Sequence, residues 1–160
     1  MDKKEILKQH PIYTATREAM SAYMDAYLAS DNFKRTTRIK RPSEDVKIYE
    51  DLIMNTSLMP IARYVVDRIN DTIFEPGQQR LLNFSGTGQQ TQPEWAQLFC
   101  LDIDLAGNDI ASFMSHANIM SSIFGHCWIS IDRTDMESRP YAQLISPLQV
   151  IDWEFENYSG

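Results

Sequence analysis

The clearest pattern of apolar and polar positions lies in residues 107–132. Its first part repeats apolar side chains at the i, i+3, i+4, i+7 spacing of an amphipathic helix. Asn108 or Asp109 can cap the start of this helix, because a short polar side chain accepts hydrogen bonds from the free amides of the first turn. Gly125 can end it, since glycine adopts a left-handed backbone at little steric cost. The pattern therefore predicts a helix over residues 108–124.

The apolar period changes to two directly after this helix. Apolar and polar side chains alternate in residues 127–132 and in residues 151–155, and residues 140–145 also suit a strand. Such alternation is typical of strands with one buried face. Polar residues separate the first two runs, and a proline-containing turn over residues 146–150 separates the last two. We predict a β-hairpin over residues 127–145 and a third strand over residues 151–155.

The amino-terminal part of the chain shows helical spacing in several runs. Helices are predicted over residues 12–29, 43–56, 57–74 and 93–105. Thr14 and Ser43 are the expected caps of the first two helices. The side chains expected to face the core are Met20, Tyr23, Met24, Tyr27, Leu28, Val46, Tyr49, Leu52, Ile53, Met59, Ala62, Val66, Ile69 and Ile73 or Phe74. Residues 31–42 break the helical pattern, and residues 75–93 are predicted to form an exposed loop with a short strand at residues 80–84.

These elements predict an α+β protein: a helical amino-terminal half, then a small antiparallel sheet packed on the helix at about residues 108–124. The 160 residues suit a single domain, residues 1–160, with a sizeable core. Three strands so close to the end of the sequence would leave an unpaired edge, which compact proteins usually cover. We therefore expect that the natural chain continues beyond Gly160.

Composition narrows the class of protein. The chain is 43% hydrophobic and 23% charged, which is usual for a soluble globular protein, and no apolar run approaches the roughly 18 residues of a membrane span. The net charge of −7 argues against a protein that coats nucleic acid non-specifically, because that affinity depends on neutralising phosphates. Cys100 and Cys127 lie in apolar sequence, which predicts buried, reduced thiols rather than a disulfide framework.

Basic residues are concentrated in one short segment. Five of the fifteen lie within eight positions, and they are Lys34, Arg35, Arg38, Lys40 and Arg41. Their local positive field could bind nucleic acid or an acidic partner. Alternatively, the segment is a solvated loop whose charges pair with nearby acids such as Asp31, Glu44 and Asp45. Phe33 is the one aromatic residue there, so stacking of several bases is not expected.

Residues with catalytic potential are few. The sequence holds no zinc-binding, nucleophile or cofactor motif, and its histidines stand apart from one another: His10, His116 and His126. Asp102, Asp104 and Asp109 follow the start of a calcium-loop pattern, but Ala106 and Phe113 occupy positions that need oxygen ligands. We predict no catalytic residue, no cofactor and no metal site. The alternative is a small metal-dependent hydrolase that uses these three aspartates.

Several stretches of the sequence resemble the amino-terminal part of tailed-bacteriophage portal proteins, which connect the phage head to its tail. These stretches are HPIY, AYMDAYLAS, YEDLIMNTSLMPIARYVVDRINDTIF, HANIMSSIFGHCWISID and RPYAQLISPLQVIDWEF. The last is the most specific, because in such portals an Arg-Pro-Tyr strand leads through a proline-containing turn into an Ile-Asp-Trp strand. The resemblance covers most of residues 10–156.

This resemblance implies a non-enzymatic structural subunit of a homo-oligomeric ring, a dodecamer, at one capsid vertex of the virion. Double-stranded DNA passes through such a ring during packaging and ejection, and the ring contacts the major capsid protein and the head–tail adaptor. It assembles in the host cytoplasm and has no membrane partner. Residues 1–160 would form the wing part of the subunit, and the parts that line the channel and bind the packaging terminase would follow Gly160. A stand-alone scaffold or adaptor domain without a ring is a further alternative.

Overall fold

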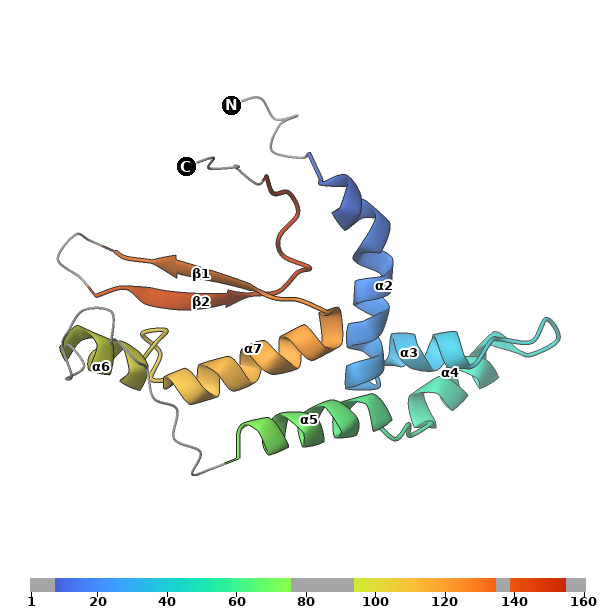
Figure 1. Cartoon of the computed structure of the whole chain (residues 1–160). Helices are drawn as coiled ribbons and strands as arrows, with labels where there is room; N and C mark the ends of the chain where they lie inside the picture. Colours follow the sequence, from blue (N-terminus) through green and yellow to red (C-terminus); the bar gives the residue numbers. More distant parts are fainter. Residues whose placement is uncertain (1–7, 76–93, 135–138, 155–160) are drawn as a thin grey trace. The chain divides into compact units, whose positions relative to one another are not determined.

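The computed structural model of the chain describes residues 8–75, 94–134 and 139–154 (Figure 1). Its elements are α2 (Pro11–Leu28), α3 (Asp31–Thr37), α4 (Val46–Asn55), α5 (Ile61–Ile73), α6 (Glu94–Leu101), α7 (Ile110–Phe124), β1 (Trp128–Asp132) and β2 (Tyr141–Ile145). A helical amino-terminal half followed by a two-stranded antiparallel sheet confirms the predicted α+β class. No helix among the described residues is long and apolar enough to cross a membrane.

The chain divides into two compact units. One contains residues 1–66 with residues 147–160, and the other contains residues 67–146. The boundary falls within α5, so that the first half of this helix belongs to one unit and its second half to the other.

In the unit of residues 67–146, α7 has the start and the end that the sequence predicts. The Asp109 side chain accepts a hydrogen bond from the Ser112 amide at 2.7 Å and caps the first turn. Gly125 ends the helix with φ of 82°, and its N–H donates to the Ser121 carbonyl. A side chain at this φ would be strained. Asp109, rather than Asn108, is therefore the cap.

The core of this unit forms where α7 meets β2. Ile103, Phe113 and Ala142 are buried together, and Phe99, Ile110 and Leu144 pack around them. The Ala142 N–H also donates to the Ile103 carbonyl at 2.7 Å, which fixes the segment after α6 to β2. The predicted packing of the sheet on the helix is confirmed.

The two strands of the hairpin are buried to different extents. Their register places Ile131 directly opposite Ala142, so both side chains lie on the same face of the sheet. Ala142 is only 1% exposed, whereas Ile131 is 69% exposed. The predicted hairpin is confirmed, but the described helices cover that face at β2 and leave it open at β1.

The predicted third strand is wrong for the residues that the structure describes. Residues 151–154 form no strand, and residue 155 lies outside the described part. Instead, the Ile151 carbonyl accepts a hydrogen bond from the His10 N–H at 2.9 Å, and the Leu148 carbonyl accepts one from the Tyr13 hydroxyl at 3.1 Å. The Ile151 carbonyl, which a strand edge could have used, is thus bonded to the residue that caps α2.

Several helix boundaries differ from the prediction because other residues act as caps. His10 caps α2 in place of Thr14, and Asp45 caps α4 in place of Ser43. Residues 31–37, predicted to break the helical pattern, form α3, because the Ser30 side chain accepts a hydrogen bond from Phe33 N and caps that helix. The third predicted helix begins at Ile61 rather than at residue 57.

The predicted core-facing side chains are only partly confirmed. Met20, Tyr49 and Ile53 are buried, as expected. Several others are exposed: Tyr23, Leu28, Val46, Leu52, Met59, Ala62, Ile69 and Ile73. Tyr13 is buried although the sequence did not indicate it. The predicted loop over residues 75–93 lies outside the described residues except for Glu75, and so does its predicted strand at residues 80–84.

A polar residue is the buried anchor of α5. Asn70 is 4% exposed, and its amide donates to the Ser115 hydroxyl at 2.8 Å. Its carbonyl oxygen accepts a hydrogen bond from the Asn118 amide at 3.1 Å. The second half of α5 therefore faces α7 through Asn70 rather than through Ile69, which explains why the predicted apolar stripe is wrong there.

We expect Asn70→Ala to lower the free energy of unfolding by about 1–3 kcal/mol, because the Ser115 and Asn118 side chains would lose their buried partner. Urea denaturation followed by circular dichroism measures this change. Thr72→Ala is the matched control, since Thr72 is exposed on the same helix and bonds only within it, to the Arg68 carbonyl. Equal losses in the two variants would contradict the anchoring role of Asn70.

Candidate functional site

The basic segment predicted from the sequence lies on α3 and on the connection to α4. Ser30 caps α3, and Asp31 lies in its first turn, where the helix dipole favours a negative charge. Lys34 and Arg35 lie in the last turn, where the dipole favours positive charge. The local sequence thus stabilises a short helix that presents basic side chains toward its carboxyl end.

Arg35 joins α3 to α4. Its guanidinium donates to both carboxylate oxygens of Glu50, at 2.7 and 2.5 Å, in a bidentate pair. The hydrogen bonds from Arg35 hold the pKa of Glu50 below its ordinary value, and the pair raises the pKa of Arg35. The Arg35 and Glu50 side chains are 40% and 43% exposed, so solvent screens part of the attraction between them.

Lys34 is more buried than Arg35 and Arg38, since its side chain is 15% exposed and theirs are 40% and 44% exposed. Its ammonium group lies 2.8 Å from the Asp31 carboxylate. It also donates to the Ile53 carbonyl at 3.5 Å, in the last turn of α4. The hydrogen bond from Lys34 lowers the pKa of Asp31. Lys34 therefore acts as a second connection between the two helices.

Glu44 organises the connection between α3 and α4. Its carboxylate pairs with Arg38 at 3.0 Å and accepts a hydrogen bond from the Arg41 N–H at 3.3 Å. The backbone hydrogen bond from Arg41 and the bond from Arg38 lower its pKa. The buried Tyr49 adds a hydrogen bond from its hydroxyl to the Arg38 carbonyl at 3.0 Å.

Three of the five basic side chains are thus ion-paired within the segment, as the pairing alternative predicts for Asp31 and Glu44. Asp45 was also expected to pair, but its carboxylate caps α4 by accepting from the Lys47 and Ile48 amides. Six basic and five acidic residues lie between positions 31 and 51, so the local charge is nearly balanced. Among the described residues, no ion pair involves Lys40 or Arg41.

The three aspartates of the alternative metal site form hydrogen bonds with their own chain. Asp102 accepts from the Gly107 N–H at 2.9 Å and pairs with Arg139 at 2.5 Å. Asp104 accepts from the Asn108 side chain at 2.7 Å, which lowers its pKa. Asp109 caps α7, and the hydrogen bond from the Ser112 N–H lowers the pKa of the Asp109 carboxyl. Within residues 8–75, 94–134 and 139–154, no three His, Cys, Asp or Glu side chains are placed to hold a metal ion.

Arg139 is a contact residue that the sequence did not reveal. Its guanidinium donates to the Leu98 carbonyl at 3.1 Å, to the Asp102 carbonyl, and to the Asp102 carboxylate. It therefore adds hydrogen bonds to two carbonyl groups at and just after the end of α6. An arginine so far along the chain gives no local signal for this role.

Among the described residues, the histidines and cysteines of α6, α7 and the start of the hairpin lie apart from one another's reactive atoms in the contacts that the structure shows. His116 is exposed on α7, and His126 lies edge-on to Trp128 with 6.2 Å between the ring centroids. Cys100 and Cys127 are free thiols, as predicted, but they are half-buried rather than fully buried. Ser121 contacts the Cys127 sulfur at 4.0 Å. These positions give no nucleophile with an adjacent base.

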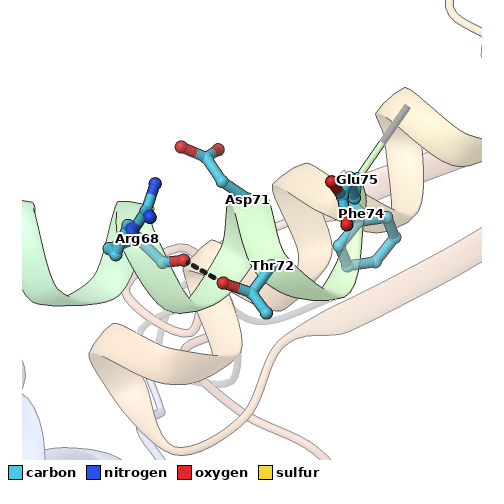
Figure 2. Close-up of a pocket in the computed structure, with 5 residues that line it drawn as sticks. All are labelled: Arg68, Asp71, Thr72, Phe74 and Glu75. Carbon is cyan, nitrogen blue, oxygen red and sulfur yellow. Dashed lines mark hydrogen bonds between the residues drawn. The ribbon is translucent and has the colours of Figure 1, made fainter.

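The end of α5 carries an open cavity of about 640 Å³. Figure 2 shows the residues that line it: Arg68, Asp71, Thr72, Phe74 and Glu75. The Thr72 hydroxyl donates back to the Arg68 carbonyl at 2.9 Å, so it is occupied within the helix. One basic and two acidic side chains next to one aromatic ring do not define a ligand class.

A second cavity, of about 490 Å³, lies between the start of α2 and the last described residues. Its lining residues are Lys8, His10, Pro11, Asp152, Trp153 and Glu154. The imidazole of His10 stacks on the indole of Trp153, with 4.1 Å between centroids and 17° between planes. His10 belongs to the HPIY stretch and Trp153 to the RPYAQLISPLQVIDWEF stretch, so these two stretches are in direct contact.

No protein-family model matches this chain, and no curated protein matches it.

The ion pairs between α3 and α4 predict a dependence on pH. The pKa values of Asp31, Glu44 and Glu50 are lowered by folding. Their stabilising contribution is therefore complete above the ordinary values of 3.8 and 4.5 and is lost as the pH falls through the lowered values. We expect a Glu44→Gln/Glu50→Gln variant to melt at a lower temperature than wild type at about pH 7, and at the same temperature at about pH 2. A difference that stays constant over this range would contradict the assignment.

Proposed function

We propose that this chain is the wing part of a structural subunit of a phage portal ring. The ring would stand at one capsid vertex, provide the conduit for DNA packaging and ejection, and connect head to tail. The resemblance over residues 10–156 carries this proposal. It is supported by the contacts of His10 with Ile151 and Trp153, because two of the resembling stretches fold against each other as one structural unit.

Exposed apolar rows on the helices support a role in assembly. On α4, Ile48 and Leu52 lie one turn apart and are exposed, on a face about 100° around the helix from the buried Tyr49 and Ile53. On α5, a row with four-residue spacing is exposed along the helix: Ile61, Val65, Ile69 and Ile73. Contiguous exposed apolar surface is typical of protein–protein interfaces.

The contacts of the basic segment indicate which of its side chains could act outside the subunit in such a ring. Arg35, Arg38 and Lys34 serve the contact between α3 and α4, so their charge is largely used within the subunit. Lys40 and Arg41 are the basic side chains that a neighbouring acidic subunit or passing DNA would meet. Repetition around a ring would multiply their field.

Of the two alternatives, the metal-dependent hydrolase fits the structure less well than a portal subunit. A metal-dependent hydrolase would need Asp102, Asp104 and Asp109 to converge on an ion, but each accepts hydrogen bonds from its own loop or helix. A stand-alone scaffold or adaptor domain fits the exposed rows as well as a portal does. The size of the assembly distinguishes these two, because only the portal requires a closed ring.

We expect the double variant Ile48→Glu/Leu52→Glu to remain folded by circular dichroism and to lose the assembly, because two charges would enter an apolar interface. Analytical ultracentrifugation of the protein expressed from its whole gene measures the loss. Lys47→Glu is the matched control, since it changes the charge at an exposed polar position of the same helix. Intact assembly of the double variant would contradict an interface on this face of α4.

We expect Lys40→Ser/Arg41→Ser to melt within a few degrees of wild type and to package less DNA, because these side chains make no ion pair in the described part of the chain. Arg35→Ser is the comparison, and it should lower the melting temperature through loss of the Glu50 pair. Nuclease-protected DNA in assembled particles measures packaging. Full packaging by the double variant would exclude a contribution of these two charges.

A further inference from the structure

The turn between α3 and α4 presents an apolar side chain next to two cations. Ile39 is 84% exposed, the largest fraction for a large apolar side chain in the described part of the chain. Lys40 and Arg41 follow it directly, and neither takes part in an ion pair among the described residues. We call these three residues the basic tip. One exposed apolar side chain is common on protein surfaces, so the surroundings of the tip decide what it means.

Hydrogen bonds hold the backbone on both sides of the basic tip. Before the tip, the Arg38 carbonyl accepts a hydrogen bond from the Tyr49 hydroxyl at 3.0 Å. At its end, the Arg41 N–H donates to the Glu44 carboxylate at 3.3 Å, and the Glu44 N–H donates to the Arg41 carbonyl at 3.0 Å. A backbone fixed in this way loses less conformational entropy on binding. The basic tip is therefore preorganised for a contact.

The charge around the basic tip favours a protein partner over DNA. Affinity for DNA grows with the number of phosphates that basic side chains neutralise. Three of the five basic side chains of the segment are ion-paired within the subunit, so few are left for phosphates. Protein interfaces, in contrast, combine an apolar centre with a polar rim. Ile39 between its own backbone turn and two cations suits a surface that is apolar and acidic.

The unit of residues 67–146 carries such a surface on α6. The unit contains ten acidic and four basic residues, a net charge of −6 with neutral histidines. Trp95, Leu98 and Leu101 are 55%, 49% and 68% exposed, and their three-residue spacing makes each the neighbour of the next along the helix. Glu94 is exposed in the first turn, one turn before Leu98. We call these four residues the α6 ridge.

We propose that the basic tip of one copy of this chain binds the α6 ridge of a second copy. Ile39 packs on the apolar side chains of the ridge, and the two cations of the tip meet its acidic end at Glu94. The two surfaces differ, so the contact is heterologous, and contacts of this kind build rings or filaments. The inference selects a neighbouring subunit rather than DNA as the partner of the tip, and it rests on the proposed function for the repeating assembly.

Photo-cross-linking tests this contact directly. Benzoylphenylalanine replaces Ile39 in chains that are expressed from the whole gene with heavy isotopes and mixed with unlabelled wild-type chains before assembly. We expect cross-links from the heavy tip to the light peptide that contains α6, mapped by mass spectrometry. Cross-links within one chain, to another part of the second chain, or to an added DNA duplex in place of α6 would overturn the proposal.

Exchange of charge between the two surfaces gives a second readout. We expect Lys40→Glu/Arg41→Glu and Glu94→Lys each to weaken self-association about tenfold in sedimentation velocity, because each places like charges opposite one another. An equal mixture of these two variants should recover association, since the reversed tip then meets the reversed ridge. Arg17→Glu is the matched control, because it reverses an exposed basic side chain on α2.

Unchanged association of the charge variants, or no recovery in their mixture, would overturn the contact. Its failure is distinguishable from failure of the proposed function. An open chain of subunits that keeps the cross-link and the recovery would support the contact between tip and ridge and contradict only the closed ring. A closed ring without either result would retain the ring and contradict this contact.

Discussion

The packing of Phe113 on α7 against Ala142 on β2 is the contact on which the unit of residues 67–146 depends. It requires that α7 begin at Asp109 and end at Gly125, because a shift by one residue would turn Phe113 away from the sheet. Ile103 completes the contact through its side chain and through its carbonyl, which accepts the Ala142 N–H. The cap, the glycine stop and the hairpin register thus serve one small core.

The sequence predicts this part of the fold well because its signals are local. The Asp109 cap, the Gly125 stop and the change of period after it all lie within one short stretch. The third strand fails for the opposite reason. Alternation in residues 151–154 is compatible with a strand, but the Ile151 carbonyl accepts a hydrogen bond from the backbone N–H of His10. Whether a strand forms therefore depends on a residue that lies far away in the sequence. Likewise, no sequence signal close to Asn70 indicates that it bonds to Ser115 and Asn118 on α7.

The candidate site shows the same division between local and distant partners. Asp31 and Glu44 lie within a few residues of the basic segment, and the sequence suffices to predict that they pair with it. Glu50 forms the bidentate pair with Arg35 from the next helix, which only the folded arrangement of α3 and α4 reveals. Three of the five basic side chains of this segment are therefore paired in or next to the contact between α3 and α4. Lys40 and Arg41 take part in none of the ion pairs among the described residues.

The proposal that this chain is a wing of a portal subunit is tested most directly by native mass spectrometry of the protein from its natural source. That measurement gives the mass of the chain and the mass of its assembly together. The account predicts a chain heavier than 18.5 kDa in a closed ring of about twelve copies. A chain of 18.5 kDa that remains a monomer at all concentrations would contradict it.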